Sequence, residues 1–160
     1  MNEEREVIFT EVQKFRQTWV WILIFLPAAL VIWHWKQLIL NPIMLIVPMI
    51  MGIICPLLFY ICNLKTEVLA DGLYFRFFPF QLSFHKINVS DIKTYEARTY
   101  SPIMEYGGWG LRYSLRHGRA YNVSGNLGVQ ITLKNGNKIL FGSQKPEEFV
   151  EALKKVIPGS

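Results

Sequence analysis

The stretch that decides the predicted fold is Pro42–Cys62, which reads PIMLIVPMIMGIICPLLFYIC. It contains no charged residue and no His, Asn or Gln. A helix over this stretch would rise about 30 Å, which matches the hydrocarbon thickness of a bilayer. Its Leu, Ile, Val and Phe residues each favour insertion by roughly 0.3–0.6 kcal/mol at the centre of a membrane. The stretch therefore predicts a helix that crosses a membrane.

A second apolar run, Trp19–Trp33, precedes this stretch and has tryptophans near both ends, where indole rings settle at a membrane surface. Spans over residues 16–35 and 42–63 would make residues 19–64 a helical hairpin. Lys and Arg are more frequent beside the outer ends of the spans than in the connection, which favours cytoplasmic chain ends. We therefore expect an integral protein of a prokaryotic inner (cytoplasmic) membrane with a cytoplasmic soluble domain. The alternative for the first run is a buried core helix.

Residues 1–18 form a polar N-terminal segment of mixed charge. Apolar side chains recur in it at helical spacing, at Ile8, Val12 and Phe15 and on to Trp19. This spacing predicts an amphipathic helix at the membrane interface. The alternative is a short strand near Val7–Thr10 that adds to the soluble domain.

Residues 65–160 form the predicted soluble domain, where the apolar period changes from helical to two. Asp71-Gly72 separates two alternating runs and predicts a β-hairpin with Val68 opposite Phe75. A later loop, Lys134–Gly136, pairs Ile131 with Ile139 if Gly136 adopts the left-handed conformation. A two-residue Asn-Gly turn would instead place Leu133 opposite Lys138. Further strands are expected at residues 83–88, 91–100, 111–115, 120–123 and 129–133.

The last residues predict one amphipathic helix that begins at Pro146, with Glu147 and Glu148 near its N-terminus. Its buried stripe would consist of Phe149, Leu153 and Val156. About seven antiparallel strands followed by this helix predict an α+β or all-β domain. In such a domain the strands form a small open barrel that the C-terminal helix caps.

Several motifs within this order of elements resemble the bacterial pleckstrin-homology-like domains. They are FFPF at Phe77–Phe80, SDI at Ser90–Ile92, and the block from SPIMEYGGWGLR to AYNVSG at residues 101–125. More narrowly, the chain resembles small prokaryotic membrane proteins with a two-helix hairpin before such a domain, a family of uncharacterised function. The resemblance implies the fold and membrane attachment but no reaction.

The block around YGGWG also contains the candidate site. Its glycines lead into a predicted strand and not into a helix, so we expect a tight bend around Trp109 and not a phosphate cradle. Leu111, Tyr113 and Leu115 alternate with basic or polar residues, which predicts one buried and one basic face. The candidate interaction patch consists of Tyr106, Gly107, Gly108, Trp109, Gly110, Arg112, Arg116, His117 and Arg119.

The functional expectation is a membrane-anchored, non-catalytic interaction or scaffold module. No catalytic pair, metal signature or cofactor motif stands out, and the three histidines lack recurring partners. Besides the bilayer, the expected partner is a membrane or cytoplasmic protein or a second copy, bound as an added strand at an open sheet edge. The net charge of +5 supports one alternative, the sensing of anionic lipids. Another is a small membrane enzyme or transporter. Nucleic acid is not expected, because basic and aromatic residues do not interleave as in a binding groove.

Overall fold

The computed structural model describes residues 7–16, 18, 21–22, 25–26, 29, 33, 46 and 50–157. The chain forms two compact units, which we describe separately. One unit combines Met1–Gln13 with Asn63–Ser160, and the other consists of Lys14–Cys62.

The described helical residues of the smaller unit include a π-helical segment, η2 (Ile50–Ile54), and the helix α4 (Cys55–Ile61). An α-helix of this length rises about 10 Å, roughly a third of a bilayer core. Pro56 lies in its first turn, and Phe59 makes an edge-to-face contact with Phe15 at 5.3 Å. Most of the first predicted span (residues 16–35), and residues 42–49 of the second apart from Ile46, lie outside the described residues.

In the described part of the chain, no helix has both the length and the apolar character that crossing a membrane requires. This finding contradicts the predicted transmembrane hairpin. It also contradicts the expected localisation in a prokaryotic inner membrane with a cytoplasmic domain.

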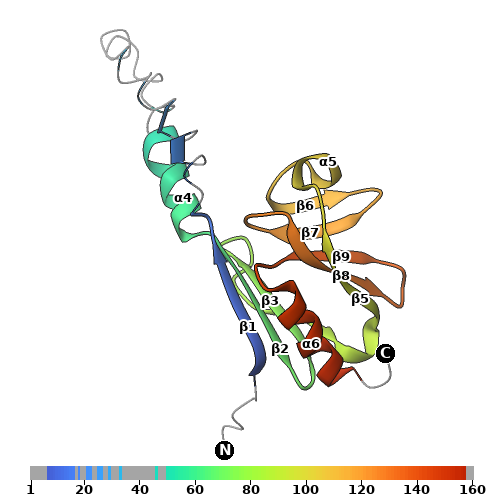
Figure 1. Cartoon of the computed structure of the whole chain (residues 1–160). Helices are drawn as coiled ribbons and strands as arrows, with labels where there is room; N and C mark the ends of the chain where they lie inside the picture. The colour runs from blue at the N-terminus through green and yellow to red at the C-terminus, as the bar shows by residue number, and fades with distance from the viewer. Residues whose placement is uncertain are drawn as a thin grey trace, which may run out of the picture. The chain divides into compact units, whose positions relative to one another are not determined.

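The larger unit contains two β-sheets and one long C-terminal helix (Figure 1). Four strands form the first sheet, in chain order: β1 (Val7–Lys14), β2 (Asn63–Leu69), β3 (Gly72–Phe78) and β4 (His85–Asn88). The second sheet has the strand order β5-β8-β9-β7-β6. Its members are β5 (Ile92–Thr99), β6 (Gly110–Ser114), β7 (Gly118–Asn122), β8 (Leu127–Leu133) and β9 (Lys138–Gly142), with a 3-10 turn, η3 (Val89–Asp91), before β5.

The expected barrel of about seven antiparallel strands is therefore wrong. The described residues form nine strands in two sheets, and β7 pairs with β9 in parallel. A parallel pair joins segments that are distant in the chain, so no local turn motif announces it.

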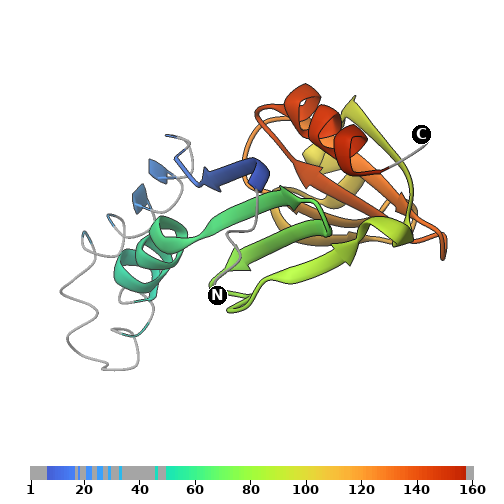
Figure 2. The same cartoon turned by 90° about the horizontal axis from the view of Figure 1, so that it is seen from below.

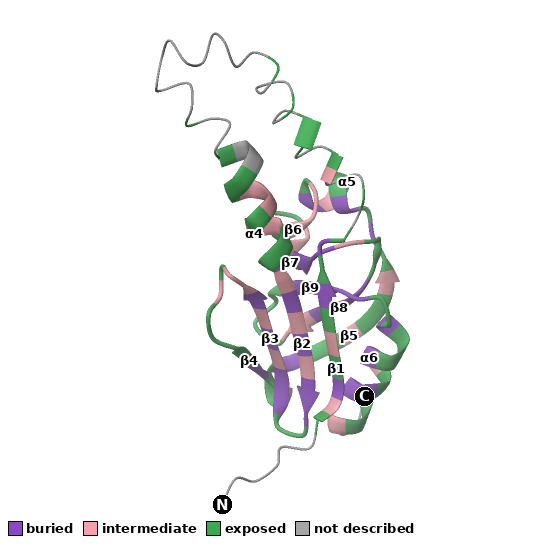
Figure 3. Ribbon diagram, turned by 90° about the vertical axis from the view of Figure 1, so that its left-hand side faces the viewer, coloured by how far each residue is buried: buried purple, intermediate pink, exposed green. Residues whose placement is uncertain are grey.

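Aromatic side chains join the two sheets in a common core. Phe75 of β3 lies 4.8 Å from Tyr121 of β7 and 4.9 Å from Phe141 of β9, measured between ring centroids. Phe141 in turn lies 6.4 Å from Phe149 of the C-terminal helix. Figure 3 shows the buried residues that line β2 and β3. Full burial of such a side chain contributes roughly 1.5–3 kcal/mol, so this cluster holds both sheets and the helix together.

The C-terminal helix α6 (Pro146–Val156) has the position and polarity that the sequence predicts. Pro146 lies in its first turn, acidic residues follow it, and Lys154 and Lys155 lie in the last turn. Phe149 and Leu153 are fully buried, and Val156, at the end of the predicted stripe, is only half-buried. The helix packs against β5, β8 and β2, and Figure 2 shows it in red along one side of the larger unit.

Residues Val7–Lys14 form strand β1 at the edge of the first sheet, not the predicted amphipathic helix. The alternative of a strand that adds to the domain was the correct one. Its inward positions are Phe9, which stacks on Phe149 at 5.0 Å, and Gln13, which donates a 2.6 Å hydrogen bond to the Gly142 carbonyl. The spacing of Ile8 and Val12 suggested a helix. In the strand these two residues lie on the other face, and the buried positions are Phe9 and Gln13.

The two predicted hairpins have different outcomes. The β8–β9 register is confirmed, because Ile131 pairs with Ile139 and Gly136 has a φ of +85°. The β2–β3 register is wrong by two residues, because Val68 pairs with Leu73 and not with Phe75. Gly72 is therefore a strand residue. A Cβ on it would lie 2.7 Å from the Ile87 carbonyl oxygen, so the close approach of β4, and not the turn, requires the glycine.

Candidate interaction site

The site begins with α5 (Pro102–Tyr106), a one-turn helix that the sequence analysis did not predict. Pro102 occupies its first turn, and the Glu105 carboxylate accepts a 2.8 Å hydrogen bond from the Ser101 N–H. Gly107, with a φ of +72°, ends the helix. The N–H groups of Gly107 and Gly108 donate to the Ile103 and Pro102 carbonyls of the helix, each at 2.9 Å. Proline at the start and glycine after the end is the sequence signal that could have found this helix.

The residues after Gly107 form the expected tight bend, which turns the chain from α5 into β6. The indole Nε1 of Trp109 donates to the Gly125 carbonyl at 2.9 Å. The Arg112 Nε in turn donates to the Trp109 carbonyl, also at 2.9 Å. The N–H of Gly110 donates to the Asn122 side chain. These bonds fix the bend to β7 and occupy Arg112 in a structural role.

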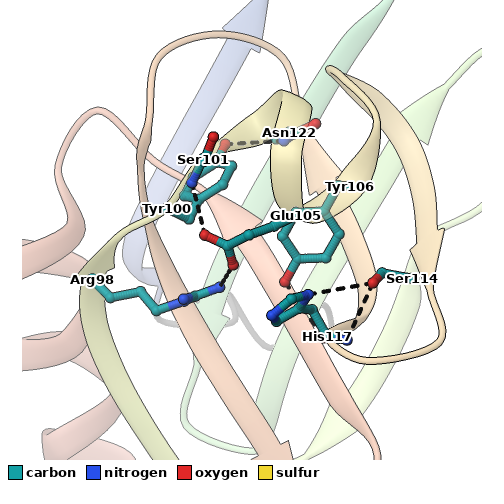
Figure 4. A network of polar contacts seen from close by, with 8 residues as sticks. All are labelled: Arg98, Tyr100, Ser101, Glu105, Tyr106, Ser114, His117 and Asn122. Carbon is teal, nitrogen blue, oxygen red and sulfur yellow. Dashed lines mark hydrogen bonds and ion pairs between the residues drawn. The ribbon is translucent and has the colours of Figure 1, made fainter.

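A polar network ties α5 to the strands beneath it (Figure 4). The guanidinium of Arg98 on β5 forms a 2.5 Å ion pair with Glu105, and both side chains are mostly shielded from solvent. Tyr106 is buried against Tyr100, with ring centroids 6.1 Å apart. The Tyr100 hydroxyl accepts a 3.0 Å hydrogen bond from Asn122. The network thus links β5, α5 and β7.

Burial determines the protonation of the two phenols in this network. Burial raises the pKa of Tyr100 to about 12, although the hydrogen bond from Asn122 opposes the shift. Burial also raises the pKa of Tyr106. Both phenols are therefore neutral at physiological pH and stay hydrogen-bonding groups. Burial alone would raise the pKa of Glu105, but the bonds from the Ser101 N–H and Arg98 outweigh it and lower that pKa.

The turn between β6 and β7 places Ser114 beside His117. The Ser114 hydroxyl accepts a 3.2 Å hydrogen bond from the His117 backbone N–H and lies 3.4 Å from the imidazole Nδ1. The Tyr106 hydroxyl donates to the His117 carbonyl at 3.4 Å. This is a side-chain-stabilised turn, in which the hydroxyl serves the backbone. Its geometry supports the hairpin and does not suggest an activated nucleophile.

Strand β6 and the turn that follows it expose the apolar side chains that the sequence predicted to be buried. Leu111 is 45 % exposed, Tyr113 68 % and Leu115 95 %. The predicted buried face is therefore wrong, and it is not separate from the basic residues, because Tyr113 pairs with Arg119. Leu111 pairs with Tyr121, so these side chains share the side that faces the first sheet. The rings that Phe75 of that sheet contacts in the second sheet, Tyr121 and Phe141, belong to strands further in from β6. The end of this face is left uncovered.

A cavity of about 460 Å³ lies at this uncovered end. We call it the hairpin groove, because two hairpins form it. The β6–β7 hairpin contributes Tyr113, Leu115, Arg116, Gly118 and Arg119, and the β8–β9 hairpin contributes Leu133, Gly136, Asn137, Lys138 and Ile139. Its lining combines apolar residues, among them Leu115, Leu133 and Ile139, with three basic residues that we call the basic rim, Arg116, Arg119 and Lys138. No Asp or Glu stands among the described residues that line it.

The structure divides the predicted interaction patch. Arg116 and Arg119 meet at the hairpin groove. Arg112 pairs with Ala120 on the opposite face of the sheet. The remaining members, Tyr106, Gly107, Gly108, Trp109, Gly110 and His117, form the bend and turn described above. Sequence reasoning missed Lys138, because the parallel pairing of β7 and β9 brings it to the groove from a distant hairpin.

Within the described residues, no group of three His, Cys, Asp or Glu side chains is arranged to hold a metal ion. No curated protein and no solved structure matches the chain. Residues 1–159 match a family of unknown function (DUF6141), and the chain therefore belongs to that family.

Proposed function

We propose that this protein is a non-catalytic interaction module that binds an extended segment of a partner protein along strand β6. The likeness to pleckstrin-homology-like domains is part of this proposal, because such domains can accept a partner strand at an open sheet edge. The observation that supports it most is the exposed apolar side of β6, an edge strand of the second sheet.

The edge position of β6 supplies the backbone groups for pairing. In the described sheets β6 pairs with β7 alone. Every second residue of an edge strand directs its N–H and C=O groups away from the sheet, where another chain can bind them. A partner strand would thus extend the sheet by one strand.

The side chains of β6 and its turn supply a driving force for that pairing. Tyr113 and Leu115 expose most of their surface. Burial of apolar surface contributes about 25 cal/mol per Å², and aromatic side chains are frequent anchors of protein interfaces. A strand added beside β6 would cover part of this surface.

The polar residues near β6 support the non-catalytic part of the proposal. Glu105 is engaged by Arg98 and by the Ser101 N–H. Tyr100 and Tyr106 are buried phenols with raised pKa values. Ser114 stabilises its own turn. Each of these groups has a structural partner that accounts for its position.

A neutral peptide probe tests the strand pairing on the purified full-length chain. The probe is a fluorescent ten-residue peptide of alternating Thr and Val, capped at both ends, and its binding is measured by anisotropy. Two further probes carry N-methyl groups on alternate amides, in opposite phase. Methylation removes the N–H groups on one side of the strand only, so we expect one phase to abolish binding and the other to preserve it.

Side-chain variants locate the binding site. Tyr113→Ser and Leu115→Ser should each weaken the binding of the neutral probe by at least about tenfold. The reason is that each substitution removes about 1.4 kcal/mol or more of apolar contact. Val12→Ser is the matched control, because Val12 is a half-exposed apolar residue on the edge strand β1. Absence of probe binding, or equal binding by both methylated probes, contradicts the proposal.

A further inference from the structure

We infer that the hairpin groove binds the carboxylate side chains of acidic residues that flank the extended segment on β6. The inference deepens the proposed function, since it names the chemistry of the partner: an extended apolar segment with Asp or Glu at one end. Three observations support it, namely the charge of the groove, the apolar residues in its lining and its continuity with β6.

The rim of the groove carries three cationic side chains, Arg116, Arg119 and Lys138. None of the three forms an ion pair with another residue in the described part of the chain. Elsewhere on the domain, by contrast, Arg98, Lys65 and Lys86 each pair with a carboxylate. The groove therefore concentrates positive charge that the chain itself leaves uncompensated.

The types of these residues favour carboxylates. An Arg guanidinium can donate two parallel hydrogen bonds to a carboxylate, and charge-assisted bonds of this kind are about twice as strong as neutral ones. Two arginines and a lysine around one cavity can hold two acidic side chains. Apolar residues of the same lining, such as Leu133 and Ile139, lower the local dielectric constant beside these bonds and strengthen them.

The groove is continuous with the edge strand. Tyr113 belongs to β6 and also lines the groove, and Leu115 follows directly in the turn. A segment paired along β6 that continues past Ser114 therefore reaches the basic rim without a sharp turn. This continuity favours an acidic peptide over an isolated phosphate or a lipid headgroup, because neither of those uses the edge strand.

The test compares the neutral Thr-Val probe with probes that carry two Glu residues at the N-terminal or at the C-terminal end, on the full-length chain. The two versions are needed because the partner strand can run in either direction. We expect one of the acidic probes to bind about tenfold more tightly than the neutral probe. A matching probe with two Lys residues should bind more weakly than the neutral one.

Variants of the rim identify the cause of that gain. We expect each of three variants to reduce the tenfold gain in affinity of the acidic probe by about threefold or more: Arg116→Ala, Arg119→Ala and Lys138→Ala. The affinity of the neutral probe should not change in these variants. Lys93→Ala is the matched control, because Lys93 is an exposed cation of the same sheet on β5, at the edge opposite to β6. Raising the salt from 50 mM to 500 mM should remove the gain but not the binding of the neutral probe.

A second measurement does not depend on strand pairing. Capped Glu-Glu-Glu is titrated into the isotopically labelled full-length chain, and amide shifts are followed by NMR. We expect saturable shifts at Arg116, Arg119 and Ile139, and none with capped Lys-Lys-Lys.

The outcomes separate the two proposals. If the neutral probe does not bind, but Glu-Glu-Glu shifts the amide signals of the groove residues, the proposed strand pairing is wrong. The inference that the groove binds carboxylates then stands. If the neutral probe binds, but acidic ends add nothing and Glu-Glu-Glu causes no shifts, the groove inference is overturned. Binding to phosphatidylglycerol vesicles that needs the same three cations and exceeds the affinity for the acidic probe overturns it in favour of a lipid surface.

Discussion

Gly118 and the backbone of Lys138 are in direct contact where β7 and β9 begin side by side. A Cβ on Gly118 would lie 2.9 Å from the Lys138 carbonyl carbon and closer still to its oxygen. At the next position along both strands, Arg119 of β7 pairs in parallel with Ile139 of β9. Gly118 also has a φ of +80°, a conformation that favours glycine. The contact lies at the start of the parallel pairing that sets the two hairpins beside each other at the hairpin groove.

We predict that Gly118→Ala lowers the free energy of unfolding of the full-length chain by about 2–5 kcal/mol. The left-handed backbone accounts for about 1–2 kcal/mol of this loss. Overlap with the Lys138 backbone accounts for about 1–3 kcal/mol, as overpacking typically does. Chemical denaturation followed by circular dichroism measures the loss.

Gly136→Ala is the matched control for this prediction. Gly136 has a φ of +85°, but a Cβ there would meet no atom within 4 Å. Only the left-handed penalty of about 1–2 kcal/mol should appear. Equal losses in the two variants would show that the contact between the hairpins contributes nothing.

The N-terminal strand gives a second prediction. Phe9→Ala removes a buried ring that stacks on Phe149, so we expect a loss of about 3–5 kcal/mol in the free energy of unfolding. Val12→Ala, on the same strand but 49 % exposed, should change it by no more than about 0.5 kcal/mol. A small effect of Phe9→Ala would mean that β1 is not part of the cooperative fold.

Local signals predicted some elements of this fold correctly. The loop at Lys134–Gly136 and the charged ends of α6 each depend on residues that are neighbours in the chain, and both appear as expected. The long apolar run at Pro42–Cys62 was a poorer guide, because its described residues form only a short α-helix and a π-helical segment. Length and hydropathy do not report where a helix begins and ends.

Features that depend on distant pairing could not be predicted from the sequence. Alternation correctly put Leu111 and Tyr113 on one face, but whether the first sheet covers that face depends on where Phe75 reaches. Lys138 likewise joins Arg116 and Arg119 only through the parallel pair of β7 and β9. The arginines of the site were therefore visible in the sequence, whereas the cavity they line was not.

The Arg98–Glu105 pair gives a prediction for acidic pH. Folding lowers the pKa of Glu105 below its ordinary value of 4.5. The stabilisation is therefore present above about pH 4.5 and is lost as the pH falls through the folded-state pKa. Glu105→Gln should lower the free energy of unfolding at pH 7 by about 1–2 kcal/mol and make its decline below pH 4.5 shallower.

Denaturant titrations at a series of pH values measure this effect. Glu148→Gln is the control, because Glu148 pairs with Lys145 on the surface, where both side chains are more than half exposed. Such pairs contribute about 0–1 kcal/mol, so the control should remain close to the unmodified chain. An unchanged acid slope in Glu105→Gln would rule out the pair as a source of acid sensitivity.

Tyr100 gives the corresponding prediction at alkaline pH. Burial raises its pKa from 10.0 to about 12, so the unfolded chain loses this proton first as the pH rises. The stabilisation from the neutral phenol is complete below about pH 10 and is lost between about pH 10 and pH 12. Tyr100→Phe should make the decline of the free energy of unfolding over this interval shallower. At pH 7 the same variant should cost about 1–3 kcal/mol, because the Asn122 side chain loses its acceptor.

Phenolate absorbance tests the cause of the shift. Asn122 donates a hydrogen bond to the Tyr100 hydroxyl, and this bond lowers the phenol pKa against the larger effect of burial. In Asn122→Ala, where this opposing hydrogen bond is absent, the most resistant phenol of the folded chain should titrate at a still higher pH. In Tyr100→Phe, the absorbance change of the phenol that loses its proton at the highest pH should be missing from the titration curve of the folded chain. If Tyr100→Phe leaves the titration above pH 10 unchanged, the raised pKa belongs to another tyrosine and the alkaline loss of stability has a different origin.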